Sequence, residues 1–303
     1  MTAILETSGR ILVVRGGAIG DFVLTLPVLF ALREAKFRVS VVGPSVVAPL
    51  AVAGGLADEW CSLDGREWAG MFAERGGCDS DLSDWLAGFE LVLSYLHDPD
   101  GILERNLKRV TMARLVRGAY RPDGIHVVDR LMQPLGELGI EVGVDGFRLA
   151  VPKVELPGAG TWLAVHPGSG SERKNWPEEN WRVLMGRVML ETDWKVFLIG
   201  GEAELGRVGC LAEGLPPNRI CRAENWPLIR VAGALRCCDI FAGVDSGIRH
   251  LAEAVGLPGV AGWSGSNLTE WGPLSDGWIV LDHTKGEAEV EDMLAELITI
   301  LTA

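Results

Sequence analysis

The stretch DIFAGVDSGIRHLAEAVGLPGVAGW, residues 239–263, holds a complete strand, turn, helix and second strand. An apolar run that ends at Val244 predicts a buried strand, and an amphipathic segment follows until Gly256 and Pro258 end it. The polar turn between them therefore lies at the carboxyl end of a strand and the amino end of a helix. Ligands bind at such turns in open parallel sheets, because free backbone N–H groups and the helix dipole attract phosphate.

This turn is made of Asp245, Ser246 and Gly247, and His250 projects from the same helix face as Ser246. Ser246 offers a small hydroxyl, and Gly247 allows a backbone to approach an anion closely. The alternative is an ordinary helix cap, which Asp and Ser also favour, followed by a histidine that packs at an interface.

A second turn of the same kind lies near the start of the chain. Residues 11–14 predict a buried strand, and residues 22–34 predict a helix that Pro27 should kink. The glycine-rich turn between them ends at Asp21, which we interpret as an acid that faces a cleft; complementing the helix dipole is the alternative. Because two turns share this geometry, we favour a ligand site over isolated caps.

Two function classes are disfavoured. The glycines at positions 16, 17 and 20 do not form G-x-G-x-x-G, and the strand at 37–43 ends without the carboxylate that would hold an NAD ribose. The net charge of −13 and the pI of about 4.9 argue against nucleic acid as a partner.

The composition predicts a two-domain globular chain in a reducing cytoplasm. The 303 residues exceed one ordinary core, and 48% of them are hydrophobic. The 6 cysteines show no C-x-x-C spacing, which favours free thiols. We also expect neither a signal peptide nor a membrane span, because no apolar run is long enough for one.

The alternation of strands and helices predicts the fold class. From residue 161 six predicted strands alternate with helices, which is typical of a doubly wound parallel sheet, and the first half alternates similarly. The Gly- and Pro-containing stretch 141–160 reads as a linker. We therefore predict two Rossmann-like α/β domains, residues 1–150 and 151–285, that face each other across a cleft.

The candidate residues suit group transfer from a nucleotide-activated donor. Lys174 follows a Gly/Ser loop and could bind phosphate, although a solvated surface lysine is the alternative. A carboxylate such as Asp21 could take the proton of an acceptor hydroxyl, while the lysine and helix N-termini stabilise a departing diphosphate. Asp98-Pro99-Asp100 has a spacing that could suit a metal, but we interpret it as a turn.

Three stretches resemble glycosyltransferase family 9, the heptosyltransferase family. They are ILVVRGGAIGDFVLTLPVLFALR (11–33), HPGSGSERKNWPEENW (166–181) and GVDSGIRHLAEAVGLPGVAGWSGSNLTEWGP (243–273), with a weaker match at 94–107. The resemblance implies a GT-B fold with the acceptor side N-terminal and the nucleotide-sugar side C-terminal. It also implies an inverting transfer without a metal or other cofactor, from a nucleotide-sugar (ADP-heptose in known members) to a lipopolysaccharide-core acceptor.

The resemblance also implies residue roles. Asp21 corresponds to the general base, and Gly17 and Gly20 belong to the acceptor-side loop. The donor side corresponds to Ser169, Lys174, Asp245, Ser246, Gly247 and His250, with Glu202 or Glu204 near the ribose. The chain is short for the family, and its loop SGSNLTEWGP (264–273) departs from the family pattern, so the donor's base and sugar stay open. The terminal helix, residues 286–303, is expected to pack toward the N-terminal domain.

Two other functions remain as alternatives. A member of the same fold could bind a nucleotide-sugar without catalysis or act as a scaffold. A nucleotide-sugar epimerase is less favoured, because it would need paired acid and base groups and Asp21 stands alone. A glycolipid acceptor would imply transient association with the inner face of the cytoplasmic membrane, although the sequence shows no basic amphipathic helix for it. The sequence predicts no oligomeric state.

Overall fold

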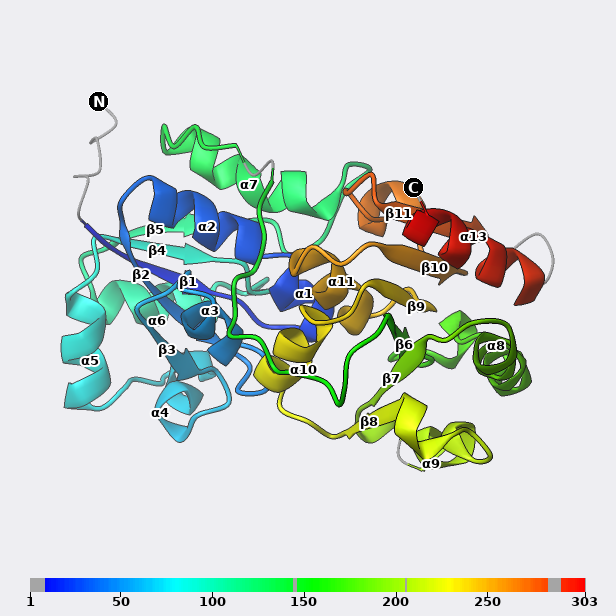
Figure 1. Ribbon diagram of the computed structural model, residues 1–303. Coiled ribbons are helices and arrows are strands. Elements are labelled where there is room, and N and C mark those ends of the chain that lie inside the picture. Colours follow the sequence, from blue (N-terminus) through cyan, green and yellow to red (C-terminus); the bar gives the residue numbers. More distant parts are fainter. Residues whose placement is uncertain (1–8, 144–145, 205, 283–289, 303) are drawn as a thin grey trace. The chain divides into compact units, whose positions relative to one another are not determined.

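The computed structural model describes residues 9–143, 146–204, 206–282 and 290–302. The chain divides into two compact units, residues 1–150 and 151–303, and the division falls within the Gly- and Pro-containing stretch 141–160 (Figure 1). Each unit has its own parallel sheet with helices packed on it. The predicted fold class of two doubly wound α/β sheets is confirmed.

The first unit contains a five-stranded sheet in the order β3-β2-β1-β4-β5, and every neighbouring pair is parallel. The strands are β1 (Arg10–Val14), β2 (Arg38–Gly43), β3 (Glu59–Ser62), β4 (Leu91–Ser94) and β5 (Arg114–Arg117). The chain leaves β1 toward one edge and returns to β4 on the other side. The topological switch point, where such sheets bind ligands, therefore lies between β1 and β4.

The helices of this unit partly differ from the predicted ones. They are α1 (Ile19–Val23), α2 (Leu26–Glu34), α3 (Pro49–Ala53), α4 (Arg66–Ala69), α5 (Ser80–Ala87), α6 (Ile102–Val110) and α7 (Val127–Glu137). The helix predicted at 22–34 is two helices, and Pro27 stands in the first turn of α2 instead of kinking one long helix. A proline is tolerated there because a first-turn N–H has no partner within the helix.

The second unit contains a six-stranded parallel sheet, as the sequence predicted. Its strand order is β11-β10-β9-β6-β7-β8. Its strands are β6 (Trp162–His166), β7 (Lys195–Gly200), β8 (Ile220–Glu224), β9 (Ile240–Val244), β10 (Gly259–Trp263) and β11 (Trp278–Asp282). Its helices are α8 (Glu178–Glu191), α9 (Arg207–Ala212), α10 (Leu228–Leu235), α11 (Gly247–Ala254), α12 (Leu268–Trp271) and α13 (Val290–Thr302). The switch point of this sheet lies between β6 and β9.

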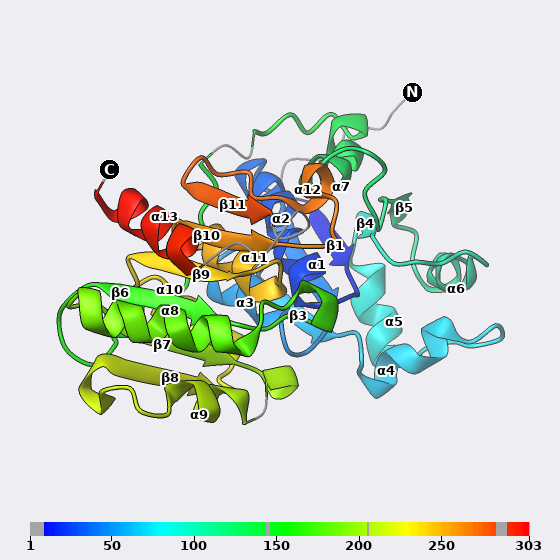
Figure 2. The same cartoon turned by 90° about the vertical axis from the view of Figure 1, so that its right-hand side faces the viewer.

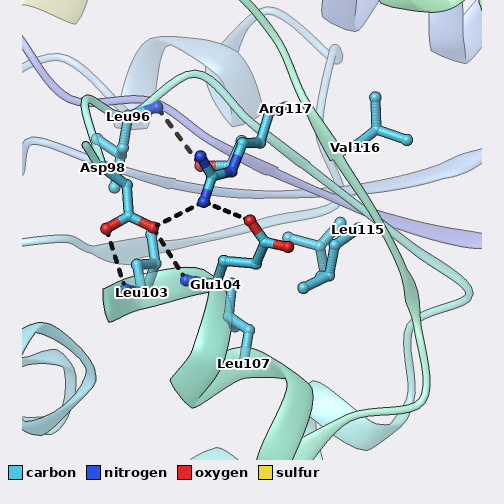
Figure 3. Close-up of a pocket in the computed structure, with 10 residues that line it drawn as sticks. Leu96, Asp98, Leu103, Glu104, Leu107, Leu115, Val116 and Arg117 are labelled. Carbon is cyan, nitrogen blue, oxygen red and sulfur yellow. Dashed lines mark hydrogen bonds and ion pairs between the residues drawn. The ribbon is translucent and has the colours of Figure 1, made fainter. Parts of the chain in front are cut away.

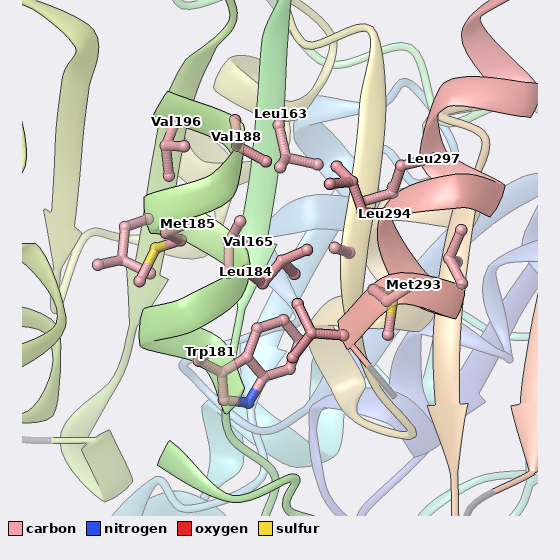
Figure 4. Packing of buried hydrophobic residues seen from close by; sticks show 14 of the residues in the cluster. Leu163, Val165, Trp181, Leu184, Met185, Val188, Val196, Met293, Leu294 and Leu297 are labelled. Atoms are coloured by element: carbon pink, nitrogen blue, oxygen red, sulfur yellow. The ribbon is translucent and has the colours of Figure 1, made fainter. Parts of the chain in front are cut away.

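A hydrophobic core joins one face of the second sheet to α8 and α13 (Figures 2 and 4). Trp181 and Leu184 of α8 lie in this core with Met293 and Leu297 of α13. The terminal helix therefore packs within its own unit, against α8, β9 and β10, whereas the sequence analysis expected residues 286–303 to pack toward the N-terminal domain. The physical reason is that the apolar side of α13 is buried in this core; residues 286–289 lie outside the described residues.

Candidate active site

In the first unit, Asp21 lies in the first turn of α1, close after the end of β1. Its Oδ2 accepts a hydrogen bond from the Ala18 N–H at 2.8 Å, which is one of the two bonds of a capping box, since Ala18 has no polar side chain for the other. The side chain nevertheless keeps 28% of its surface exposed. Asp21 thus completes the helix start, as the alternative interpretation held, and still presents carboxylate surface to solvent.

The buried side chain of Arg15 holds the carboxylate of Asp21 in place. The guanidinium Nη2 lies 3.2 Å from Asp21 Oδ1, and Nη1 donates to the carbonyl oxygens of Tyr95 at 3.3 Å and Tyr120 at 3.4 Å. Burial lowers the pKa of Arg15, while the neighbouring Asp21 raises it. The sequence analysis missed Arg15, although a charged residue directly after a buried strand was the available signal.

The two glycines that were expected on the acceptor side, Gly17 and Gly20, both belong to this turn. Gly17 has φ +98°, and a Cβ there would stand 2.6 Å from Asp21 Oδ2. A side chain at position 17 would therefore strain the backbone and displace the carboxylate. Gly20 lies in the first turn of α1, directly before Asp21.

In the second unit, side chains from three strand-end loops meet at Asp245, which is 4% exposed. Its Oδ2 accepts hydrogen bonds from Lys174 Nζ at 2.6 Å and from Ser266 Oγ at 2.5 Å, and its Oδ1 lies 4.0 Å from His250 Nε2. Lys174 follows β6, Asp245 follows β9 and Ser266 follows β10. The Lys174 side chain remains 32% exposed, so its ammonium group keeps room for a further acceptor.

A second group of contacts surrounds Ser246. Its Oγ accepts from the Arg249 N–H at 3.2 Å and so caps α11, which confirms the cap interpretation. The same oxygen lies 3.2 Å from His166 Nδ1, and His166 Nε2 lies 4.0 Å from Glu204 Oε2. Burial lowers the pKa of His166 to about 4, so the ring is neutral near pH 7.

The structure separates the two glutamate candidates. Glu204 is 6% exposed and accepts a hydrogen bond from the Gly201 N–H at 2.9 Å, beside His166. Glu202 is exposed, although it shares the 3-10 turn of residues 202–204 with Glu204.

The remaining donor-side candidates have different positions. Ser169 Oγ lies 2.7 Å from the Ser171 carbonyl oxygen and 2.9 Å from Asn175 Oδ1, so it shapes the loop before Lys174. Gly247 is the first residue of α11. The sequence analysis did not single out His166, which opens the family-like stretch 166–181, or Ser266, which it counted as part of a loop.

A separate pocket in the first unit is lined by residues of β4, β5, α6 and the segment between β4 and α6 (Figure 3). Arg117 lies between the carboxylates of Asp98 and Glu104, and Asp98 accepts the N–H groups of Leu103 at 3.2 Å and Glu104 at 3.1 Å. Asp98 is therefore engaged in starting α6. The interpretation of Asp98-Pro99-Asp100 as a turn is confirmed, since the Gly101 N–H bonds back to the Asp98 carbonyl oxygen.

None of the helices in the described ranges has the length and apolar character needed to cross a membrane. The longest apolar one, α13 (Val290–Thr302), has 13 residues and packs into the core.

Comparison with known proteins identifies relatives of this chain. The model of glycosyltransferase family 9 (heptosyltransferase) matches residues 143–295. The lipopolysaccharide heptosyltransferase 1 of Pseudomonas aeruginosa is 29% identical over 305 aligned residues, which cover 89% of this chain and 80% of that protein.

Solved structures show the same fold. A family 9 glycosyl transferase from Veillonella parvula superposes with a TM-score of 0.80 at 18% identity, covering 99% of both chains. The Escherichia coli ADP-heptose lps heptosyltransferase II superposes with a TM-score of 0.76 at 16% identity, covering 97% of this chain and 98% of that one.

Proposed function

Because this chain belongs to glycosyltransferase family 9, the heptosyltransferase family, we propose that it moves heptose from ADP-heptose to a hydroxyl of a lipopolysaccharide-core or related glycan acceptor. The observation that carries the proposal is the Lys174–Asp245 pair beside the start of α11. A partly exposed cation next to a helix N-terminus is a good site for a diphosphate. The similar fold of the Escherichia coli ADP-heptose lps heptosyltransferase II supports this donor.

On the donor side, Lys174 binds the diphosphate, and the N-terminus of α11 at Ser246 and Gly247 adds backbone N–H groups. Asp245 orients Lys174 through the 2.6 Å hydrogen bond and holds sugar hydroxyls with its remaining acceptor capacity. Glu204 contacts the ribose, and His250 lies next to Asp245. These groups balance the charge of the departing ADP, so the proposed reaction uses no metal.

On the acceptor side, Asp21 is the general base. The Ala18 N–H and Arg15 hold its carboxylate, while its exposed surface receives the proton of the acceptor hydroxyl. The acceptor oxygen forms a bond to the anomeric carbon as the bond from that carbon to the phosphate oxygen breaks. Attack from the opposite face inverts the anomeric configuration.

The test measures binding and transfer separately. A thermal-shift screen against ADP, UDP, GDP and CMP should give a selective shift with ADP, since a ligand at 100 times its Kd stabilises by about 2.7 kcal/mol. ADP-heptose with an inner-core acceptor should then release ADP. Selective stabilisation by another nucleotide would contradict the donor, and ADP binding without transfer would favour a non-catalytic member of the family.

We further propose transient docking at the cytoplasmic face of the inner membrane, where a glycolipid acceptor lies. The exposed side of α6 carries Arg105, Lys108 and Arg109, followed by the fully exposed Met112. Basic side chains around an exposed apolar one favour an anionic lipid surface. The apolar side of α6, with Leu103 and Leu107, is buried in the core, so only its basic side and Met112 would meet the lipid surface.

Sedimentation with lipid vesicles tests the docking. Vesicles with acidic phospholipid should retain the protein at low salt, and zwitterionic vesicles should not. Lys108→Gln combined with Arg109→Gln should weaken retention, whereas equal retention of both proteins would contradict the proposal.

A further inference from the structure

The turn that caps α11 contains a buried arginine that the proposed chemistry does not use. Arg249 lies between Ser246 and His250 and has 0% of its surface exposed. Its Nη1 donates to Glu253 Oε2 at 2.7 Å, and its Nη2 donates to the Trp271 carbonyl oxygen at 2.8 Å. Nη2 also lies 2.7 Å from Nδ1 and 2.9 Å from Nε2 of His250. A buried charge is costly unless it is paired, so this network needs a reason.

The partner of this arginine also holds the loop after β10. Glu253 Oε1 accepts the N–H groups of Leu274 at 2.7 Å and Ser275 at 3.0 Å. Together with the contact to Trp271, the Arg249–Glu253 pair binds three backbone groups of one loop, residues 264–277.

The same loop reaches the Lys174–Asp245 pair. Ser266 Oγ donates to Asp245 Oδ2 at 2.5 Å, and Ser264 Oγ donates to the carbonyl oxygen of Arg173, the residue before Lys174. The guanidinium of Arg249 also lies over Trp263, where this loop begins, at 5.7 Å from the ring centroid. The buried Arg249 and its partner Glu253 therefore connect α11 to the loop that hydrogen-bonds Asp245 and the residue before Lys174.

We propose that Arg249 and Glu253 are positioning residues of the donor site. They fix the His250 ring and hold the 264–277 loop, so that Ser266 keeps Asp245 directed at Lys174. This inference rests on the proposed function, because it assumes that Lys174 and Asp245 bind the donor. It adds that the shape of the donor site depends on the Arg249–Glu253 ion pair, which does not itself contact the donor. It also adds that the loop of residues 264–277 is part of the donor site.

The test compares Arg249→Lys, Glu253→Gln and Ser266→Ala with the wild type. A lysine cannot reach Glu253, Trp271 and His250 together, because it lacks the fork of the guanidinium. Each variant should raise the KM for ADP-heptose and the Kd for ADP and leave kcat largely unchanged. The expected increase is roughly tenfold, which corresponds to the loss of one hydrogen bond to a charged group. Arg182→Lys, in an exposed i,i+4 pair with Glu178 on α8, is the matched control and should change neither.

Coupling separates positioning from a merely structural role. If Arg249 acts through the loop, Arg249→Lys and Ser266→Ala together should cost much less than the product of the two single effects. Multiplicative effects, or unchanged ADP affinity in a folded Glu253→Gln, would overturn the inference. The outcomes distinguish the two proposals. A wild type that does not bind ADP would contradict the proposed function, whereas an active wild type with variants of unchanged KM and Kd would contradict only this inference. Melting temperatures show which variants fold. If Arg249→Lys does not fold, Ser266→Ala still tests the inference, because its hydroxyl is partly exposed and its removal should not unfold the protein.

Discussion

The two sheets place opposite charges at their switch points. In the first unit a buried cation, Arg15 at 2% exposure, holds a carboxylate that is 28% exposed, Asp21. In the second unit a buried carboxylate, Asp245 at 4% exposure, holds a cation that is 32% exposed, Lys174. In both, the buried partner fixes the geometry and the exposed partner keeps surface for a ligand. The same topology can therefore present an acid in one unit and a cation in the other.

The two pairs also differ in how the chain builds them. Arg15 and Asp21 are 6 residues apart, on one turn, and backbone carbonyl groups hold the arginine. Lys174 and Asp245 are 71 residues apart, and side chains from other loops hold them. The two members of the first pair are therefore close in the sequence, although the carbonyl groups of Tyr95 and Tyr120 come from distant segments, whereas the second pair joins two different loops.

The largest expected effect separates the chemical roles of the two pairs. Asp21→Asn keeps the hydrogen bond from Ala18 but removes the base, so transfer should fall roughly 10²–10⁴-fold. The affinity for ADP should stay unchanged, because the proposed ADP contacts lie in the second unit. Single-turnover transfer and calorimetry with ADP measure the two quantities. Asp84→Asn, at an exposed position on α5, is the control, and an equal loss of rate there would remove Asp21 from its role.

A pH effect should come from the second unit through His166. The pKa of His166 is lowered to about 4 in the folded chain, whereas an unfolded histidine titrates near 6.5. The unfolded state therefore binds more protons between these values. Neutral His166 therefore contributes fully to the free energy of unfolding above pH 6.5. This contribution falls by up to about 3 kcal/mol as the pH drops toward 4.

Urea unfolding of the wild type and of His166→Asn at several pH values measures this effect. The variant should lose less stability than the wild type between pH 7 and pH 4. Parallel pH profiles of the two proteins would show that His166 does not titrate in this way.

A smaller effect should follow from Lys174→Met. Loss of the ammonium group should weaken ADP binding roughly ten- to a hundredfold, as expected for a charge-assisted hydrogen bond to phosphate. Adenosine, which has no diphosphate, should bind the variant and the wild type equally. Lys153→Met, at an exposed position, is the control, and a parallel loss of adenosine affinity would indicate a general disturbance of the site.

The smallest expected effect is that of a chelator. If Lys174 and the start of α11 balance the charge of the leaving diphosphate, excess EDTA should leave the transfer rate within about twofold. A rate that collapses with EDTA and returns with Mg²⁺ would require a metal at the diphosphate.

The sequence predicted the turns because their signals are local. A buried strand, a polar turn and an amphipathic segment are contiguous at both Asp21 and Asp245, so the six-stranded sheet and both strand-end turns could be foreseen. The prediction of one helix at 22–34 was wrong because Pro27 stands in the first turn of α2. A proline near a helix start and one inside a helix look alike in a sequence. Strand β5 was missed because its four residues begin and end with an arginine, and helix α5 because its 8 residues are too few for a clear period.

The partners of the turns could not be predicted for a different reason. Ser266 reaches Asp245, and His166 reaches Ser246, only because the loops after β6, β9 and β10 lie close together in the fold. No spacing in the sequence indicates that these loops meet. The same holds for the choice of Glu204 over Glu202, which depends on one side chain turning inward beside His166. Arg249 was read as part of an amphipathic helix, where an arginine normally faces water, and its burial is a tertiary effect.

Strand β5 ends the first sheet in the described part of the chain, and its sequence limits what can be added there. Its four residues read RLVR, and the exposed Arg114 and Arg117 stand at its two ends. Another strand that paired with β5 would have to strip water from Arg114 and approach a guanidinium already engaged by Asp98 and Glu104. Short, charged edge strands of this kind discourage edge-to-edge aggregation. The arginines thus protect this edge of the first unit from pairing with another copy, without affecting the end of β1, where Asp21 lies.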